Sequence, residues 1–168
     1  FTLVGKALYR RVLTYERVLP VTGATFSKTG DIIKFDEPAK KMGVDTMRYY
    51  FASQSPTNDI RFGYTRGDET RRQLISLWNI HSFFLTYAGI DKPNLAGLKN
   101  PEKLLNEMDH WLLARLHEFL KNAKLAYEEY NTAVVIREFE AFTEDLSNWY
   151  IRANRRRFWK SGANDEKL

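Results

Sequence analysis

The C-terminal half of the sequence repeats apolar residues with the spacing of amphipathic helices. From Asn131 or Thr132 onward they recur at intervals of four, three, four, three and four residues, at Val135, Phe139, Phe142, Leu146, Trp149 and Ala153. This stripe is typical of a helix that packs in a bundle. A second helix is expected from about residue 106 to 129, with an apolar face of Trp111, Leu112, Leu116, Phe119, Leu120 and Ala123. A third is expected from its cap, Asp68, to about Tyr87, with these residues inward: Leu74, Leu77, Trp78, Phe84 and Leu85.

The first third of the chain has shorter and more mixed patterns. Apolar spacing predicts a helix over residues 1 to about 15, and residues 18–21 read as a short strand. Residues 24–31 are polar and glycine-flanked, which indicates a loop. Asp36-Glu37-Pro38 predicts the start of a short helix that ends near Gly43, and another helix follows from Val44. Residues 53–65 are expected to form a connection.

These patterns predict a mainly α fold, in which an antiparallel helix bundle follows a small α/β piece. We expect two parts, residues 1–64 and 65–168, with a loop over residues 88–101. A chain of 168 residues can bury a core of its own. Hydrophobic residues make up 43% of it, which excludes intrinsic disorder.

Composition narrows the compartment and the chemistry. The sequence has no cysteine, so disulfides and thiolate zinc sites are excluded and a reducing, cytoplasmic location is expected. No apolar run reaches the roughly 20 residues of a membrane helix. The chain begins with Phe1 inside an apolar segment, and we therefore expect it to be a piece of a longer protein.

Metal and acid–base sites are not expected. His81, His110 and His117 stand alone, without a second histidine at helical spacing, so no metal site is predicted. The carboxylate pairs at 128–129 and 144–145 lie beside cations and are typical of solvated helix faces. No complete catalytic constellation is visible.

The loop around Ser27, Lys28 and Thr29 has two interpretations. A lysine between hydroxyl residues, followed by Gly30, can hold a phosphate, because the ammonium supplies charge and the hydroxyls supply donors. The same residues also suit an ordinary surface turn.

The end of the last helix is the most basic part of the chain. Its residues from 152 to 160 carry five positive charges and no negative one, with two aromatic residues interleaved: Arg152, Arg155, Arg156, Arg157, Phe158, Trp159 and Lys160. Arginines fork to phosphates and aromatic rings stack on unpaired bases, so this end is predicted to bind RNA. Cations also favour a helix C-terminus, but one or two of them would be enough for that.

Several segments of the chain resemble isoleucyl-tRNA synthetases. The run from Asp145 to Ser161 is similar to part of that family's helical anticodon-binding domain. Phe35 to Arg48, Ala52 to Thr57 and Leu77 to Tyr87 also match its usual sequence, so the resemblance covers nearly the whole chain.

The resemblance implies a role for the polar loop and also a limit. Ser27, Lys28 and Thr29 occupy the place of the family's Lys-Met-Ser-Lys-Ser signature, which binds ATP phosphates, although Thr25 replaces the first lysine. The family's first signature, His-Ile-Gly-His, is not in this sequence, and neither are the nucleotide-binding fold and the editing domain.

The chain is therefore expected to be a tRNA-binding fragment of isoleucine–tRNA ligase that does not aminoacylate alone. The resemblance implies that the parent uses ATP and Mg²⁺, while the fragment needs no cofactor. Its expected partners are isoleucine-specific tRNA and the rest of the synthetase, and a monomer is expected. Two alternatives stay open: a free-standing synthetase-like RNA-binding or assembly module without catalysis, and a bundle with no RNA role.

Overall fold

The computed structural model describes residues 5–23, 33–93 and 101–160, and most of these are helical. In chain order the elements are β1 (Val18–Pro20), α1 (Asp36–Met42), α2 (Val44–Ala52), β2 (Ile60–Phe62), α3 (Tyr64–Asp91), the 3-10 turn η2 (Pro101–Leu104), α4 (Glu107–Glu128), α5 (Thr132–Glu144), the π-helical segment η3 (Asp145–Ile151) and α6 (Arg155–Trp159). This confirms the predicted mainly α fold. No helix in these ranges has the length and apolar content to cross a membrane.

The small α/β piece has its own buried cluster. Strands β1 and β2 pair in parallel, with Val18 opposite Ile60. Helices α1 and α2 pack beside them and bury Met42, Met47, Tyr50 and Phe62. Gly43 separates the two helices with a φ of 89°, a backbone conformation that glycine adopts without steric cost.

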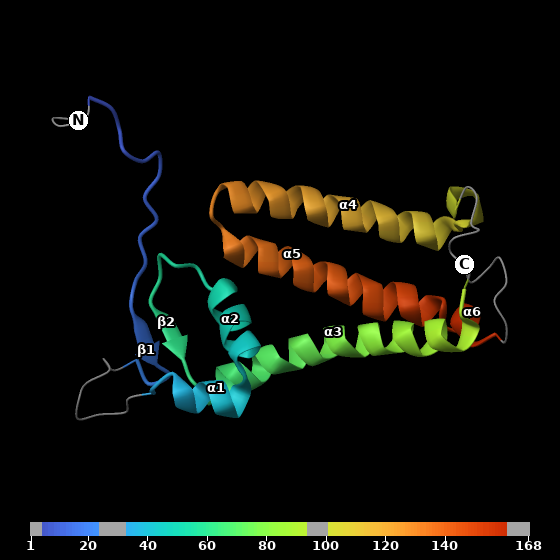
Figure 1. Ribbon diagram of the computed structural model, residues 1–168, viewed down its shortest axis with the longest axis horizontal. Helices are drawn as coiled ribbons and strands as arrows, with labels where there is room; N and C mark the ends of the chain where they lie inside the picture. The colour runs from blue at the N-terminus through green and yellow to red at the C-terminus, as the bar shows by residue number, and fades with distance from the viewer. Residues whose placement is uncertain (1–4, 24–32, 94–100, 161–168) are drawn as a thin grey trace.

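Helices α4 and α5 form an antiparallel hairpin (Figure 1). The Asn106 side chain caps α4 and the Asn131 side chain caps α5. Between them Tyr130 takes a φ of 58°, which turns the chain back. Small residues, Ala123 and Ala126, lie against Val135 and let the two helices approach closely.

Helix α3 joins the α/β piece to the far end of the hairpin (Figure 1). Near its start, Gly67 lies against Met42, and a Cβ at position 67 would come within 2.6 Å of the Met42 sulfur. Near its end, Phe83 packs on Phe158 of α6. The helix starts at Tyr64 and not at Asp68, which lies exposed in its first turns. The division of the chain at residue 64 stays a prediction.

Part of the expected inward face of α3 is exposed. Among the described residues nothing covers Trp78, Phe84 or Leu85, which are more than half exposed, so their predicted burial was wrong. Leu74 and Leu77 are partly buried, as expected. The apolar spacing identified the helix correctly, but it could not show which stretch has a neighbour.

The prediction of an N-terminal helix was also wrong within the described residues. Residues 5–17 form no helix, and Leu8, Val12 and Leu13 are exposed. A short helix is stable only when it buries an apolar face, and this segment buries none here. It is tied to the hairpin by Arg11, whose guanidinium bonds to the Glu129 carboxylate at 3.0 Å.

Residues 53–65 were expected to form only a connection, but they contain strand β2. Pairing with β1 stabilises this strand.

The last helix changes its winding after α5. Segment η3 has π-helical hydrogen bonding, which inserts one extra residue relative to an α-helix. Four residues of the predicted apolar stripe are buried or partly buried, as expected: Val135, Phe139, Phe142 and Leu146. On the facing helix α4, Leu120 was expected on the apolar face but is about half exposed. Beyond Leu146 the extra residue rotates the helix. The predicted inward positions Trp149 and Ala153 are therefore exposed.

Candidate nucleic-acid interface

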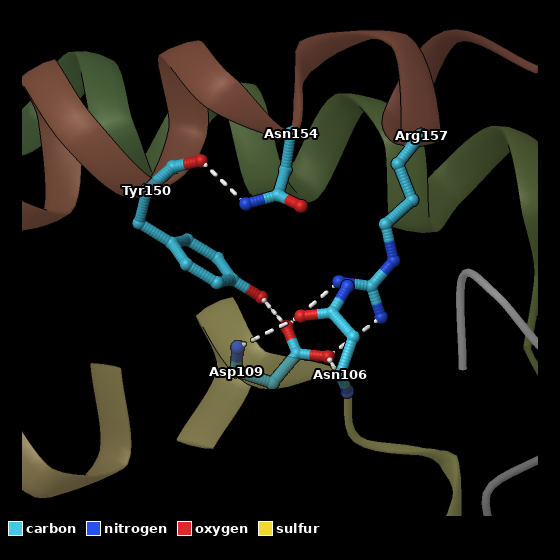
Figure 2. Close-up of polar contacts among 5 residues, drawn as sticks. All are labelled: Asn106, Asp109, Tyr150, Asn154 and Arg157. Carbon is cyan, nitrogen blue, oxygen red and sulfur yellow. Dashed lines mark hydrogen bonds and ion pairs between the residues drawn. The ribbon is translucent and has the colours of Figure 1, made fainter. Parts of the chain in front are cut away.

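Asp109 is a buried carboxylate at the start of α4, and it binds Tyr150 and Arg157 from the last part of the described chain. The Asp109 Oδ1 atom accepts hydrogen bonds from the Tyr150 hydroxyl at 2.6 Å and from Arg157 Nη1 at 2.7 Å. Its Oδ2 atom accepts from Arg157 Nη2 at 2.8 Å and from the Asn106 backbone amide at 2.9 Å. Figure 2 shows these groups converging on Asp109 from two helices. Four donors therefore satisfy one carboxylate that is almost fully buried.

Local sequence signals explain each member of this cluster. Asn106 and Asp109 form a capping box, in which each side chain accepts from the other's backbone N–H. The π segment turns Tyr150 inward in place of Trp149. A turn at Asn154 separates the preceding helix from α6. The side-chain amide of Asn154 donates a hydrogen bond to the Tyr150 carbonyl at 2.9 Å. A second link, from Arg115 Nε to Asp145 at 2.7 Å, fixes η3 to α4.

The cluster has a defined protonation state. Burial raises the pKa of Asp109, but hydrogen bonds from Arg157, Tyr150 and the Asn106 amide lower it by more than burial raises it. The pKa of Asp109 therefore lies below its ordinary value. The bond to Asp109 raises the pKa of Arg157. Burial, followed by the bond to Asp109, raises the pKa of Tyr150 to about 12. At neutral pH the cluster is thus an ion pair with a neutral tyrosine.

The remaining cations of this end face the solvent. Arg152, Arg155, Arg156 and Lys160 are exposed. The Arg155 guanidinium lies 4.6 Å from the centre of the Trp159 ring, a cation–π contact, and that ring is about half exposed. Exposed guanidinium groups beside an exposed indole can contact phosphates and stack on bases.

Phe158 lies differently from the neighbouring cations. Its ring is edge-on to Phe83 of α3 at 5.4 Å and also contacts Tyr150. These aromatic residues line a largely apolar cavity of about 400 Å³ between α3 and η3. A smaller hollow beside it, lined by Phe83 and Ile151, is bordered by Arg152 and Arg155. Arg152 and Arg155 thus border a hollow that shares Phe83 and Ile151 with the aromatic cavity.

The other predicted residues are placed as follows. Ser27, Lys28 and Thr29 lie outside the described residues. His81, His110 and His117 are exposed, and within the described ranges no three histidine, aspartate or glutamate side chains gather as a metal site would require. Sequence reasoning missed Asp109 and Tyr150. The Asn-x-x-Asp spacing at the start of α4 is a capping-box pattern and could have singled out Asp109.

Similarity to known proteins agrees with this geometry. Residues 109–168 match the family described as the anticodon-binding domain of tRNA ligase. The chain is 39% identical to the isoleucine–tRNA ligase of Thermus thermophilus over 95% of its own length and 16% of that protein. The corresponding enzyme of Deinococcus radiodurans is 35% identical over 95% of the chain and 15% of the enzyme, and that of Bacillus thuringiensis is 34% identical over 97% and 16%. The chain thus spans about a sixth of these relatives, is homologous over nearly its whole length to a segment of isoleucine–tRNA ligases, and matches over residues 109–168 the anticodon-binding domain of tRNA ligases.

Proposed function

We propose that the chain binds tRNA through the exposed cations at its C-terminal end. Arg152, Arg155, Arg156 and Lys160 contact phosphates, and Trp159 stacks on an unpaired base. The observation that carries this proposal is the position of these exposed cations inside the segment that matches an anticodon-binding domain. Arginine forks and exposed aromatic rings are the groups that single-stranded RNA loops require.

The finer part of the proposal concerns the longer protein. The relatives are named isoleucine–tRNA ligase, so we propose that the tRNA is isoleucine-specific and that this chain acts with the rest of such a ligase. That ligase would join isoleucine to tRNA with ATP and Mg²⁺, and the loop of Ser27, Lys28 and Thr29 would contact ATP phosphates.

Fluorescence anisotropy with labelled isoleucine tRNA tests the binding proposal. Kobs is measured at several salt concentrations for the wild type and for the Arg152/Arg155/Arg156→Met variant. Each lost phosphate contact makes the slope of log Kobs against log salt shallower by roughly 0.7 to 0.9. We therefore expect the triple variant to lose about two to three units of slope if all three arginines contact phosphates.

A matched control removes the same charge from another place. Lys121 and Lys124 in the last turns of α4 and Arg137 in the first turns of α5 are exposed. The turn that joins α4 and α5 lies at the end of the hairpin away from α6 (Figure 1), so the triple change of these residues to methionine should leave most of the slope intact. If both triple variants bind alike, the binding is unspecific for this end and the proposal is wrong.

Catalysis by these 168 residues alone is not expected, because they correspond to about a sixth of the relatives. Isoleucine-dependent exchange of pyrophosphate into ATP measures the activation step directly. Exchange above a no-protein blank would contradict this expectation and would require a catalytic site within the chain.

A further inference from the structure

Arg157 differs from its neighbours because its guanidinium is already paired. Both terminal nitrogens bond to Asp109, at 2.7 and 2.8 Å, and its side chain is only 17% exposed. A phosphate could take these donors only by leaving a buried carboxylate without its counter-ion, which is costly. The arginines at 152, 155 and 156 are exposed and have no such buried pair.

We propose that Arg157 does not contact RNA but is a positioning residue, which with Asp109 and Tyr150 holds α6 so that the exposed arginines face the RNA. This inference rests on the proposed function. It assigns to two groups that bear no free positive charge, a carboxylate and a phenol, a part in RNA affinity.

The geometry of α6 shows why it needs such an anchor. The helix has five residues, follows a turn at Asn154 and gives way to extended backbone at Lys160. A helix of this length is not stable by itself in water. Among the described residues its side chains are held to the bundle by the Arg157 fork and by Phe158 against Phe83 and Tyr150. Without the fork, α6 would lose the two hydrogen bonds that join it to the buried carboxylate of α4.

The π segment determines which arginine becomes the anchor. With regular α-helical winding after Leu146, Trp149 and Ala153 would continue the inward stripe. The extra residue of η3 brings Tyr150 and Asn154 to that side instead, and Arg157 follows Asn154 by three residues, over Asp109. Segments of π-helix often occur at functional sites.

Asp109→Asn separates positioning from simple electrostatics. The change removes a negative charge from a basic surface, so charge alone predicts tighter RNA binding. Positioning predicts weaker binding, because α6 loses its anchor. At 0.1 M salt one phosphate contact changes affinity roughly five- to eightfold. If one contact is lost, we expect binding roughly five- to eightfold weaker and a shallower salt slope.

Arg157→Lys and Arg157→Met complete the comparison. Lysine keeps the charge but cannot form the two-pronged bond, so both variants should bind tRNA as weakly as Asp109→Asn. The double variant Asp109→Asn/Arg157→Met should be no weaker than either single one, because the pair acts as a unit. Glu144→Gln, which neutralises an exposed carboxylate on α5, is the control and should bind at least as well as the wild type.

Hydrogen exchange supplies a readout without RNA. At a temperature where circular dichroism shows every variant folded, amides of residues 155–160 should exchange faster in Asp109→Asn than in the wild type, while those of α5 and of α4 beyond its capped first turn should not. If wild-type protein fails to bind tRNA, the proposed function is wrong. If the wild type binds but Asp109→Asn binds as well or better, or Arg157→Lys binds like the wild type, the positioning role is wrong.

Discussion

The ion pair between Arg157 and Asp109 should contribute measurably to the stability of the fold, and Arg157→Met tests this. The change removes two charge-assisted hydrogen bonds and leaves a carboxylate whose side chain is 6% exposed. Losing one partner of a buried pair typically costs about 3–5 kcal/mol. Because the Tyr150 hydroxyl and the Asn106 amide still donate to Asp109, we expect the lower end, about 3 kcal/mol.

Urea unfolding followed by circular dichroism measures this free energy. For a protein of this size a loss of about 3 kcal/mol lowers Tm by roughly 6–12 °C. The control is Lys41→Met. It breaks a pair of the same length, 2.7 Å, but both of its side chains are more than half exposed, so no measurable change is expected.

The pH dependence of the difference follows from the direction of the Asp109 shift. Its pKa is lowered in the folded protein, so its contribution is complete above the unfolded value of about 3.9 and is lost as the pH falls through the folded value. In Arg157→Met the main lowering influence is gone. The difference in unfolding free energy between wild type and variant should therefore be smaller at pH 3 than at pH 7. A difference at pH 7 below about 0.5 kcal/mol would refute the reasoning.

Two further predictions concern Tyr150 and the π segment. Tyr150 should ionise near pH 12, observed by NMR of labelled tyrosine rings. Since the pKa of Tyr150 is raised in the folded protein, the stability that Tyr150 contributes is complete below about pH 10 and is lost as the pH rises from about 10 to about 12. Tyr150→Phe should therefore lose less stability than the wild type between these two pH values. An ionisation at an ordinary tyrosine pKa would contradict the buried bond to Asp109. Deleting Asn148 should convert η3 to a regular α-helix. The residues before and after the deletion should still face inward, so the expected cost in urea unfolding is below about 1.5 kcal/mol. Inserting one alanine after Asn148 should rotate Arg157 away from Asp109 and cost at least as much as Arg157→Met; equal effects of deletion and insertion would contradict the register argument.

Local signals were sufficient to predict several helix boundaries. Helices α4 and α5 begin directly after Asn106 and Asn131, and Pro38 sits in the first turn of α1, as expected from sequence. These helix starts depend on a few neighbouring residues, so they can be predicted from the sequence alone. The short strand predicted over residues 18–21 is also present, as β1 (Val18–Pro20).

Features that depend on distant partners were not predictable. Strand β2 exists because β1 lies beside it, more than forty positions away in the chain. Trp78 and Phe84 repeat at helical spacing but have no described neighbour to cover them. Spacing shows that a face is apolar, but only tertiary contacts show whether it is buried.

The basic end shows the same limit at the level of single residues. Charge and spacing make five cations between residues 152 and 160 equivalent, since each can bind a phosphate. The fold distinguishes one of them, because a carboxylate lies buried 48 positions earlier and an extra helical residue turns Arg157 towards it. Asp109 itself is recognisable from sequence only as half of a capping box. A residue that caps one helix thus also binds another, and one of the five cations in this basic stretch is already paired within the protein.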